Sequence, residues 1–154
     1  SKNFGLYRER TGAMTLICNS DAAAAVAITQ IAGAARAMYS MPPDHGAATV
    51  QLILSNDALR TEWDAELTEM RDRINGLRAQ FVKQIQSIGI EQDFSFIERE
   101  KGMFSFLGVN VDQVQTLVND YSIYLVNSSR INVAGINDSN IEYLSNSLAA
   151  VLKA

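Results

Sequence analysis

The feature that most constrains the fold is a long amphipathic stretch in the middle of the chain. Its apolar residues recur at steps of three and four, which is the spacing of one face of an α-helix. They are Leu59, Trp63, Leu67, Met70, Ile74, Leu77, Phe81, Ile85 and Ile88. A Ser-Asn-Asp capping signal precedes the stretch and Gly89 ends it. A helix of about thirty residues is about 45 Å long at 1.5 Å per residue, so we expect residues 57–89 to join two domains, 1–56 and 90–154.

Two shorter helices and one strand are expected before this helix. Residues 12–19 are a short apolar run, which is typical of a buried strand. Asp21 is expected to cap a helix that runs to about Met38, because the Pro42-Pro43 pair cannot continue it. A second helix is expected from about residue 44 to residue 54.

After Gly89 the pattern changes to short elements of both kinds. Strands are expected at residues 94–97, 102–107, 122–126 and 130–133, and helices at 111–119 and from Asn137 to near Leu152. Strands and helices alternate in this order along the chain. The pattern therefore indicates an α/β or α+β fold.

Composition excludes several classes of function. A chain of 154 residues with 47% hydrophobic and 19% charged residues is globular and suits one domain or parts of two. A net charge of −4 and a pI near 4.9 argue against nucleic acid as a partner. No apolar run is long enough to predict a membrane span. Cys18 is the only cysteine and His45 the only histidine, so neither a disulfide nor a metal site is indicated, and the cytoplasm is the expected location.

The first ten residues carry the chemistry. They read SKNFGLYRER and combine a lysine amine, which can form a Schiff base with an aldehyde, with an arginine, which binds phosphate through two hydrogen bonds. Gly5 suits a turn where backbone approaches a ligand closely. The string resembles the lysine segment of class I aminotransferases, which depend on pyridoxal 5'-phosphate (PLP). By this resemblance Lys2 bonds the cofactor and Arg10 binds its phosphate, although Thr11 replaces an aliphatic residue that the family usually has.

Three further blocks continue the resemblance in the same order and spacing. They are RAMYSMPPDHGA at residues 36–47, GMFSF at 102–106 and SSRINVAG at 128–135. The whole chain thus resembles homodimeric bacterial aspartate and aromatic-amino-acid aminotransferases. The resemblance implies the α/β fold of type I PLP-dependent transferases. Residues 1–56 would then end the large PLP-binding domain, 57–89 would be the interdomain helix, and 90–154 would be the small domain.

The resemblance also implies the substrate contacts. Arg130 matches the arginine that holds the substrate α-carboxylate, with Ser129 in place of the usual preceding glycine. A planar guanidinium suits this role because it grips a carboxylate through two parallel hydrogen bonds. Arg36 matches the arginine that reaches across the dimer to a second carboxylate. Phe104 matches an aromatic residue that lines the substrate pocket.

A ping-pong transamination follows from the resemblance. Lys2, displaced by the incoming amino acid, would act as a general base at the substrate Cα, and a 2-oxo acid would leave. The active site would be shared across the interface of a homodimer. Groups that contact the cofactor ring and its nitrogen would come from an upstream part of the same enzyme. No residue in this sequence matches them.

The resemblance also implies that Ser40 and Met41 bind substrate and that Ser40 lies near the same subunit boundary as Arg36. The choice of substrate depends on Met41. Aspartate-specific relatives usually carry asparagine where this chain has Met41, and methionine suits large apolar side chains. We therefore expect transamination of phenylalanine, tyrosine and tryptophan with 2-oxoglutarate, and an aspartate aminotransferase is the alternative. A third reading, from another class, is a non-catalytic C-terminal fragment that acts as a folding or assembly unit.

Overall fold

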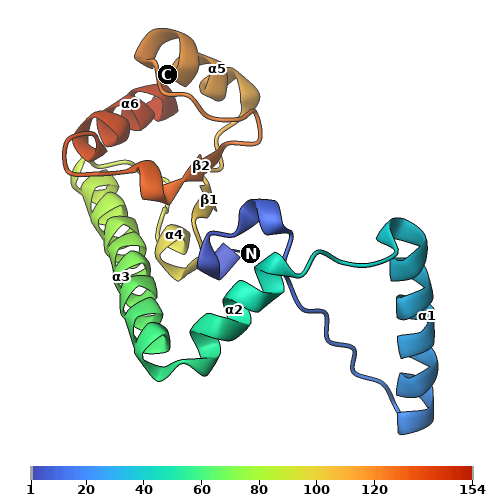
Figure 1. Cartoon of the computed structure of the whole chain (residues 1–154). Helices are drawn as coiled ribbons and strands as arrows, with labels where there is room; N and C mark the ends of the chain where they lie inside the picture. The colour runs from blue at the N-terminus through green and yellow to red at the C-terminus, as the bar shows by residue number, and fades with distance from the viewer. Residues whose placement is uncertain (1, 154) are drawn as a thin grey trace. The chain divides into compact units, whose positions relative to one another are not determined.

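The computed structural model describes residues 2–153, and these are mostly helical with one small sheet. They form six α-helices, three short 3-10 helices and two β-strands. They group into two compact units that meet in sequence between Leu67 and Thr68. Helix α3 (Asp57–Ser87) begins in the first unit and continues into the second (Figure 1). The predicted long helix is therefore confirmed, whereas the domain limits expected at residues 56 and 89 stay a prediction.

The first unit begins with two 3-10 helices, η1 (Lys2–Phe4) and η2 (Tyr7–Glu9). The ring of Phe4 stacks on Trp63 of α3, with centroids 4.6 Å apart and an interplanar angle of 6°. The Trp63 indole N–H also donates a hydrogen bond of 3.0 Å to the carbonyl of Asn3. These two contacts fix the segment that carries Lys2 to the first half of α3.

Helices α1 (Asp21–Tyr39) and α2 (His45–Ser55) complete the first unit. Both agree with the predicted helices, but Ser20, not Asp21, caps α1, because the Ser20 hydroxyl accepts a hydrogen bond from the amide of Ala23. Ser40 ends α1 with a φ of 64°. Asn56 caps α3 by accepting from the amides of Ala58 and Leu59.

The buried strand predicted at residues 12–19 is wrong. The segment has no regular secondary structure and its apolar side chains are exposed, including Ile17 at 95%. A strand needs a neighbouring strand to satisfy its backbone N–H and C=O groups. The described residues of the first unit form only helices and loops, so they offer no such neighbour.

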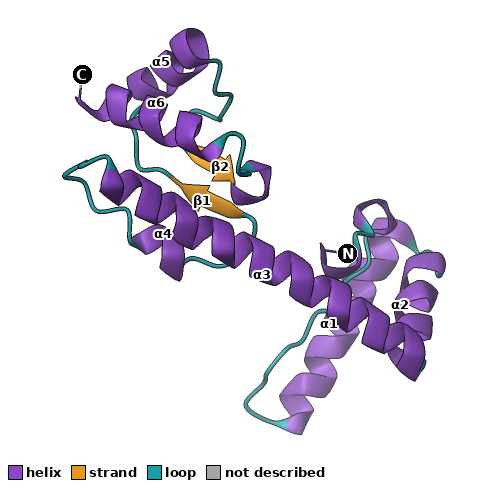
Figure 2. Ribbon diagram, turned by 90° about the vertical axis from the view of Figure 1, so that its left-hand side faces the viewer, coloured by secondary structure: helices purple, strands orange, loops and turns teal. Residues whose placement is uncertain are grey.

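The second unit is built on the last two thirds of α3. It contains the short helix α4 (Phe96–Arg99), strand β1 (Phe104–Phe106), helix α5 (Val111–Tyr121), strand β2 (Arg130–Asn132), the 3-10 helix η3 (Val133–Gly135) and helix α6 (Ile141–Lys153). Figure 2 shows the two strands side by side. They pair antiparallel, with Phe104 opposite Asn132 and Phe106 opposite Arg130. The strands predicted at 102–107 and 130–133 are confirmed in shorter form.

Two other predicted strands are wrong, each for a local reason. At residues 94–97 a helical turn forms, because the Asp93 carboxylate accepts hydrogen bonds from the amide and hydroxyl of Ser95 and starts α4. These hydrogen bonds lower the pKa of Asp93, the one from the Ser95 amide most. Residues 122–126 alternate between half-buried and exposed but pair with no strand.

The other two predicted helices of this unit are present. A capping box of Asn110 and Gln113 begins α5. The last helix begins at Ile141, later than the predicted Asn137, because the Asn137 side chain instead accepts from the Ser139 amide in a turn. Helix α6 packs against α5. Within residues 2–153, no helix is long and apolar enough to cross a membrane.

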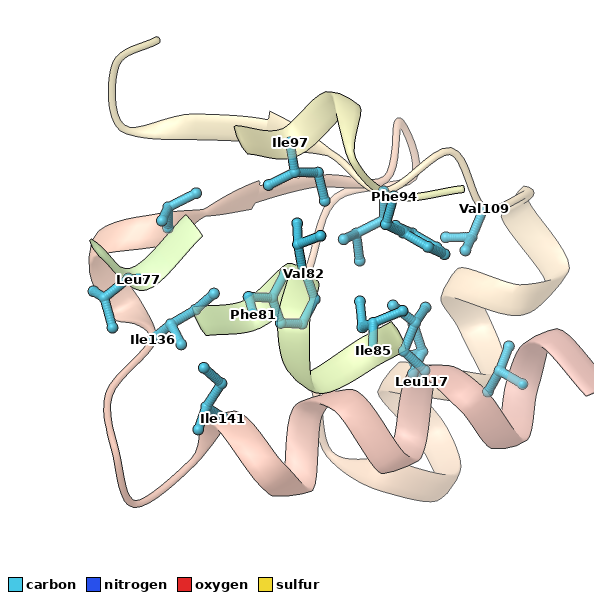
Figure 3. Close-up of a cluster of buried hydrophobic side chains, with 14 of the residues drawn as sticks. Leu77, Phe81, Val82, Ile85, Phe94, Ile97, Val109, Leu117, Ile136 and Ile141 are labelled. Atoms are coloured by element: carbon cyan, nitrogen blue, oxygen red, sulfur yellow. The ribbon is translucent and has the colours of Figure 1, made fainter. Parts of the chain in front are cut away.

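The hydrophobic core lies in the second unit. Figure 3 shows Phe81, Val82 and Ile85 of α3 among apolar side chains that include Ile97 and Ile141. Of the predicted stripe of α3, only Leu77, Phe81 and Ile85 are buried. Nearer the start of the helix the stripe is open to solvent, since Leu59 is 37% and Met70 is 53% exposed. The first unit has no comparable cluster among its described residues. The second unit is therefore the part whose internal packing positions its own side chains.

Candidate functional site

In the first unit the predicted cofactor ligands, Lys2 and Arg10, both contact Tyr7. The Lys2 ammonium lies 5.1 Å from the centroid of the Tyr7 ring, within the range of a cation–π contact. The Arg10 guanidinium donates a hydrogen bond of 2.9 Å to the Tyr7 carbonyl. Both cationic side chains are exposed. The structure therefore brings an amine and a guanidinium together on one short segment and leaves both open to a ligand.

The backbone at Arg10 has an unusual conformation, and α2 lies against its two neighbours in sequence. Arg10 has a φ of 52°, in the left-handed region. The carboxylate of its neighbour Glu9 lies 3.2 Å from Nδ1 of His45. Gly46 is buried, and a Cβ built on it would lie 2.7 Å from the Cβ of Glu9 and would overlap the hydroxyl oxygen of Thr11. The start of α2 thus packs against the two residues that flank Arg10.

The residues predicted at a subunit boundary lie at the end of α1. Arg36 is in the last turn and is exposed, and no partner for its guanidinium is present among residues 2–153. Its carbonyl accepts a hydrogen bond of 3.1 Å from the Ser40 amide. Met41 is 78% exposed and follows directly. Arg36, Ser40 and Met41 therefore form one exposed helix end with a free cation.

In the second unit the structure brings Arg130 and Phe104 together. Side chains of an antiparallel pair that are opposite or diagonal share one face of the sheet, and Arg130 is diagonal to Phe104 in the register. The Arg130 guanidinium carbon lies 4.7 Å from the centroid of the Phe104 ring. This contact places a cation over an aromatic face. Arg130 forms no ion pair with a carboxylate in the described part of the chain.

A cavity of about 610 Å³ adjoins this pair. Its lining is mostly apolar and comes from β1, the segment after α5, β2 and the start of α6. The lining residues are Phe104, Ile123, Tyr124, Leu125, Val126, Arg130, Ile131, Asn132, Gly135, Ile136, Asn140 and Leu144. Such a hollow can take a small ligand whose carboxylate reaches Arg130.

The serine before Arg130 adopts the conformation that a glycine would favour. Ser129 is buried and has a φ of 62°. Its hydroxyl accepts a hydrogen bond of 3.2 Å from the Gly108 amide, and its carbonyl accepts one of 3.0 Å from the Leu107 amide. The hydroxyl therefore adds a tie between the two loops that flank the sheet. This tie offsets part of the strain of a left-handed serine.

Two contributors to these sites were not predicted from the sequence. Tyr7 lies inside the first motif, but its place in the sequence indicates no role for it. Arg78 is a charged residue at a buried position of the α3 stripe, four residues after Ile74 and three before Phe81. A cation in phase with an apolar stripe is a signal that could have identified it.

Comparison with known proteins identifies the relatives of this chain. The sequence profile described as Aminotransferase class I and II matches residues 1–148. The aspartate aminotransferase of Haemophilus influenzae is 51% identical over 152 residues, which are 99% of this chain and 38% of that protein. The aromatic-amino-acid aminotransferase of Escherichia coli K12 is 37% identical, again over 99% of this chain and 38% of that protein.

Solved structures give the same result. A crystal structure of the aromatic-amino-acid aminotransferase from Burkholderia pseudomallei, covalently bound to pyridoxal phosphate, matches with a TM-score of 0.87 and 43% identity. The match covers 97% of this chain and 38% of that one. The chain therefore spans less than half the length of the relatives it matches.

Proposed function

Because the chain belongs to the class I and II aminotransferases, we propose that the full-length protein that contains it is a PLP-dependent aspartate aminotransferase. The observation that carries the substrate assignment is the 51% identity to an aspartate aminotransferase, against 37% and 43% to two aromatic-amino-acid aminotransferases. These identities favour the alternative reading over the aromatic preference that Met41 indicated. Since the chain spans 38% of these relatives, we assign the activity to a longer protein that contains it, and an upstream part would contribute to the site.

The chemistry of the donor set fits PLP. The cofactor has an aldehyde and a phosphate, and the first unit presents an amine and a guanidinium on one segment, both in contact with Tyr7. Lys2 would hold the cofactor through its amine, and Arg10 would bind the phosphate through two charge-assisted hydrogen bonds. When bound, PLP supplies an electron sink for the bond broken at the substrate Cα. Lys2, once free, would take the proton from that Cα and return it in the reverse reaction.

Two arginines are assigned to substrate binding, Arg130 and Arg36. Arg130 would bind the α-carboxylate, with its guanidinium carbon 4.7 Å from the centroid of the Phe104 ring. Arg36 would bind the second carboxylate of aspartate or glutamate in the partner subunit of a homodimer. Support for this role comes from its exposure and from its lack of a partner among residues 2–153. Ser40 and Met41 would line the same boundary, and the cytoplasm stays the expected location.

An aromatic-amino-acid aminotransferase is the second candidate. Met41 is an exposed, flexible apolar side chain at the predicted subunit boundary, and it suits a large substrate side chain. The similarity to the Burkholderia pseudomallei structure is compatible with this assignment. The two candidates differ in which amino donor has the higher kcat/KM.

The test is a transamination assay of the full-length protein, with 2-oxoglutarate as acceptor and aspartate or phenylalanine as donor. We expect a higher kcat/KM for aspartate, and we expect Lys2→Ala to lose activity by several orders of magnitude while it still binds PLP noncovalently. A wild type that prefers phenylalanine would support the second candidate. Near-normal turnover by Lys2→Ala would overturn the assignment of Lys2.

The non-catalytic alternative is tested on the same preparation. Intact mass and the visible absorbance of bound cofactor are measured together. A purified chain of 16.9 kDa with no visible band and no transamination would support a folding or assembly unit. A longer chain with a visible band would support the enzyme.

A further inference from the structure

Arg78 of α3 is the most deeply buried charged residue of the second unit. Its exposed fraction is 1%. Charged side chains are almost never buried to this degree unless they are paired or coordinated by acceptors. The acceptors that surround this guanidinium therefore decide what it does in the fold.

The guanidinium gathers acceptors from a single stretch of chain, residues 97–105. Nη1 donates to the Ile97 carbonyl at 2.9 Å and to the Ser105 hydroxyl. Nη2 donates to the carbonyls of Gly102 at 2.7 Å and Phe104 at 3.0 Å. Both arms of the fork are therefore used, and each donates to a residue of β1, Nη1 to Ser105 and Nη2 to Phe104.

The balance of charge around Arg78 is incomplete. Its only acidic partner among the described residues is Glu100, at 3.5 Å, and that carboxylate is 33% exposed. Its Nε–H has no hydrogen-bond partner in the part of the chain that the structure describes. The cation is thus stabilised mainly by backbone carbonyls, whose positions it fixes in return.

Strand β1 transmits this position to the opposite face of the sheet. Successive side chains of a strand point to opposite faces. Ser105 is buried at 1% and faces Arg78, whereas Phe104 is 44% exposed on the other face, where it supports Arg130. Arg78 and Arg130 therefore contact opposite faces of β1, Arg78 through Ser105 and Arg130 through the Phe104 ring.

We propose that Arg78 is a positioning residue for the substrate carboxylate: it fixes the backbone of Phe104, and through the Phe104 ring it orients the Arg130 guanidinium. The proposal rests on the proposed function, since it takes Arg130 as the carboxylate ligand. Arg78 does not touch the substrate. A lysine at this position keeps the charge but has one ammonium in place of the fork, and it cannot serve both arms.

The test is a calorimetric titration of the full-length holoenzyme with succinate, a dicarboxylate that has no amino group to transfer. Arg78→Lys is expected to raise the Kd for succinate about tenfold. The reason is that a misoriented Arg130 guanidinium would lose about one hydrogen bond to the succinate carboxylate. Arg71→Lys is the matched control. Arg71 is on the same helix, its side chain is 59% exposed and it pairs only with its neighbour Asp72. The Arg71→Lys variant should therefore bind succinate with the Kd of the wild type.

A second pair of variants separates positioning from simple stabilisation. If Arg78 acts through the Phe104 ring, then Arg78→Lys should change the Kd by less than about twofold when Phe104→Ala is already present, because the two effects are coupled. Ser105→Ala removes only the hydroxyl that accepts from Arg78, so it should also raise the Kd for succinate, by less than Arg78→Lys does. This milder variant serves if Arg78→Lys does not fold.

The outcomes distinguish the inference from the proposed function. A wild type that binds no succinate and transaminates nothing would overturn both. If the wild type, Ser105→Ala and any folded Arg78→Lys all bind succinate with the same Kd, the inference alone is overturned. A lower melting temperature in Arg78→Lys with an unchanged Kd would show that Arg78 is structural only.

Discussion

Replacing Gly46 by alanine is predicted to destabilise the first unit and to disturb the predicted phosphate ligand. Gly46 is buried near the start of α2, against the backbone segment that holds Arg10. A new Cβ would lie 2.7 Å from the Glu9 Cβ and would overlap the Thr11 hydroxyl oxygen. Carbon atoms attract each other best at about 3.5–4.0 Å, so the neighbouring backbone must move.

The magnitude follows from two opposing effects. Overpacking of this kind costs about 1–3 kcal/mol. Alanine has a higher helix propensity than glycine, worth up to about 1 kcal/mol in a helix interior, and less is gained at the second residue of α2. We therefore expect Gly46→Ala to lower the free energy of unfolding by about 1–2 kcal/mol.

Gly76→Ala is the matched control for this change. Gly76 lies inside α3, and a Cβ built on it meets nothing within 4 Å. The same substitution there should raise the free energy of unfolding by up to about 1 kcal/mol, from helix propensity alone. The difference between the two variants isolates the contact of Gly46 with Glu9 and Thr11.

The assay is denaturant unfolding of the full-length protein at one fixed PLP concentration, because bound ligand adds to stability. The PLP affinity of each apoenzyme is measured by titration. Gly46→Ala should bind PLP more weakly, since the residues on both sides of Arg10 must shift, and Gly76→Ala should bind it normally. Equal stability and equal PLP affinity in the two variants would refute the reasoning.

Three further predictions concern single side chains. Arg130→Lys keeps the charge but loses the two-pronged guanidinium, so kcat/KM should fall for aspartate and phenylalanine alike, by about 2–4 kcal/mol of transition-state binding. A loss for one substrate only would mean that Arg130 binds the substrate side chain and not the α-carboxylate. Arg36→Ala should lower kcat/KM about a hundredfold for aspartate but less than about tenfold for phenylalanine, and equal losses would make Arg36 structural. The lowered pKa of Asp93, due mainly to the Ser95 amide, means that its charge stabilises the fold fully above the ordinary value of 3.8 and ceases to do so as pH falls through the folded-state pKa. The melting-temperature difference between wild type and Asp93→Asn should therefore be constant near neutral pH and shrink below about pH 4, and a difference independent of pH would contradict this.

The helices could be predicted from the sequence because their signals are local. The caps at Asn56 and Asn110 are side chains that bind amides two or three residues away. The long α3 follows from its spacing of apolar residues, which needs no knowledge of what it packs against. Even so, the sequence did not indicate that only the second half of this stripe would be buried.

The strands could not be predicted with the same success, because a strand depends on a partner that is distant in sequence. The runs at 12–19 and 122–126 have apolar patterns of strands, but no neighbour pairs with them among the described residues. At 94–97 a local competitor, the Asp93 carboxylate, starts a helical turn instead. The apolar pattern of these runs indicates in part which side chains are buried, but it does not indicate which segment the backbone pairs with.

The candidate site shows the same division. The motifs indicated Lys2, Arg10 and Arg130, since each is a reactive or charged group within a specific string. Roles that depend on packing were not visible in the sequence. Gly46 and Arg78 became interpretable only when their neighbours in space were known.

The sheet that carries Arg130 is too small to hold its own position. A two-stranded sheet is marginally stable in water, and β1 and β2 have three residues each. Its geometry must therefore come from ties outside the ladder, such as the Val133 amide to the Met103 carbonyl at 2.8 Å and Arg78 to the Phe104 carbonyl at 3.0 Å. The second of these ties originates in α3, in the middle of the hydrophobic core. Substitutions that loosen the α3 core should consequently weaken carboxylate binding even though they lie on the opposite face of the sheet from Arg130.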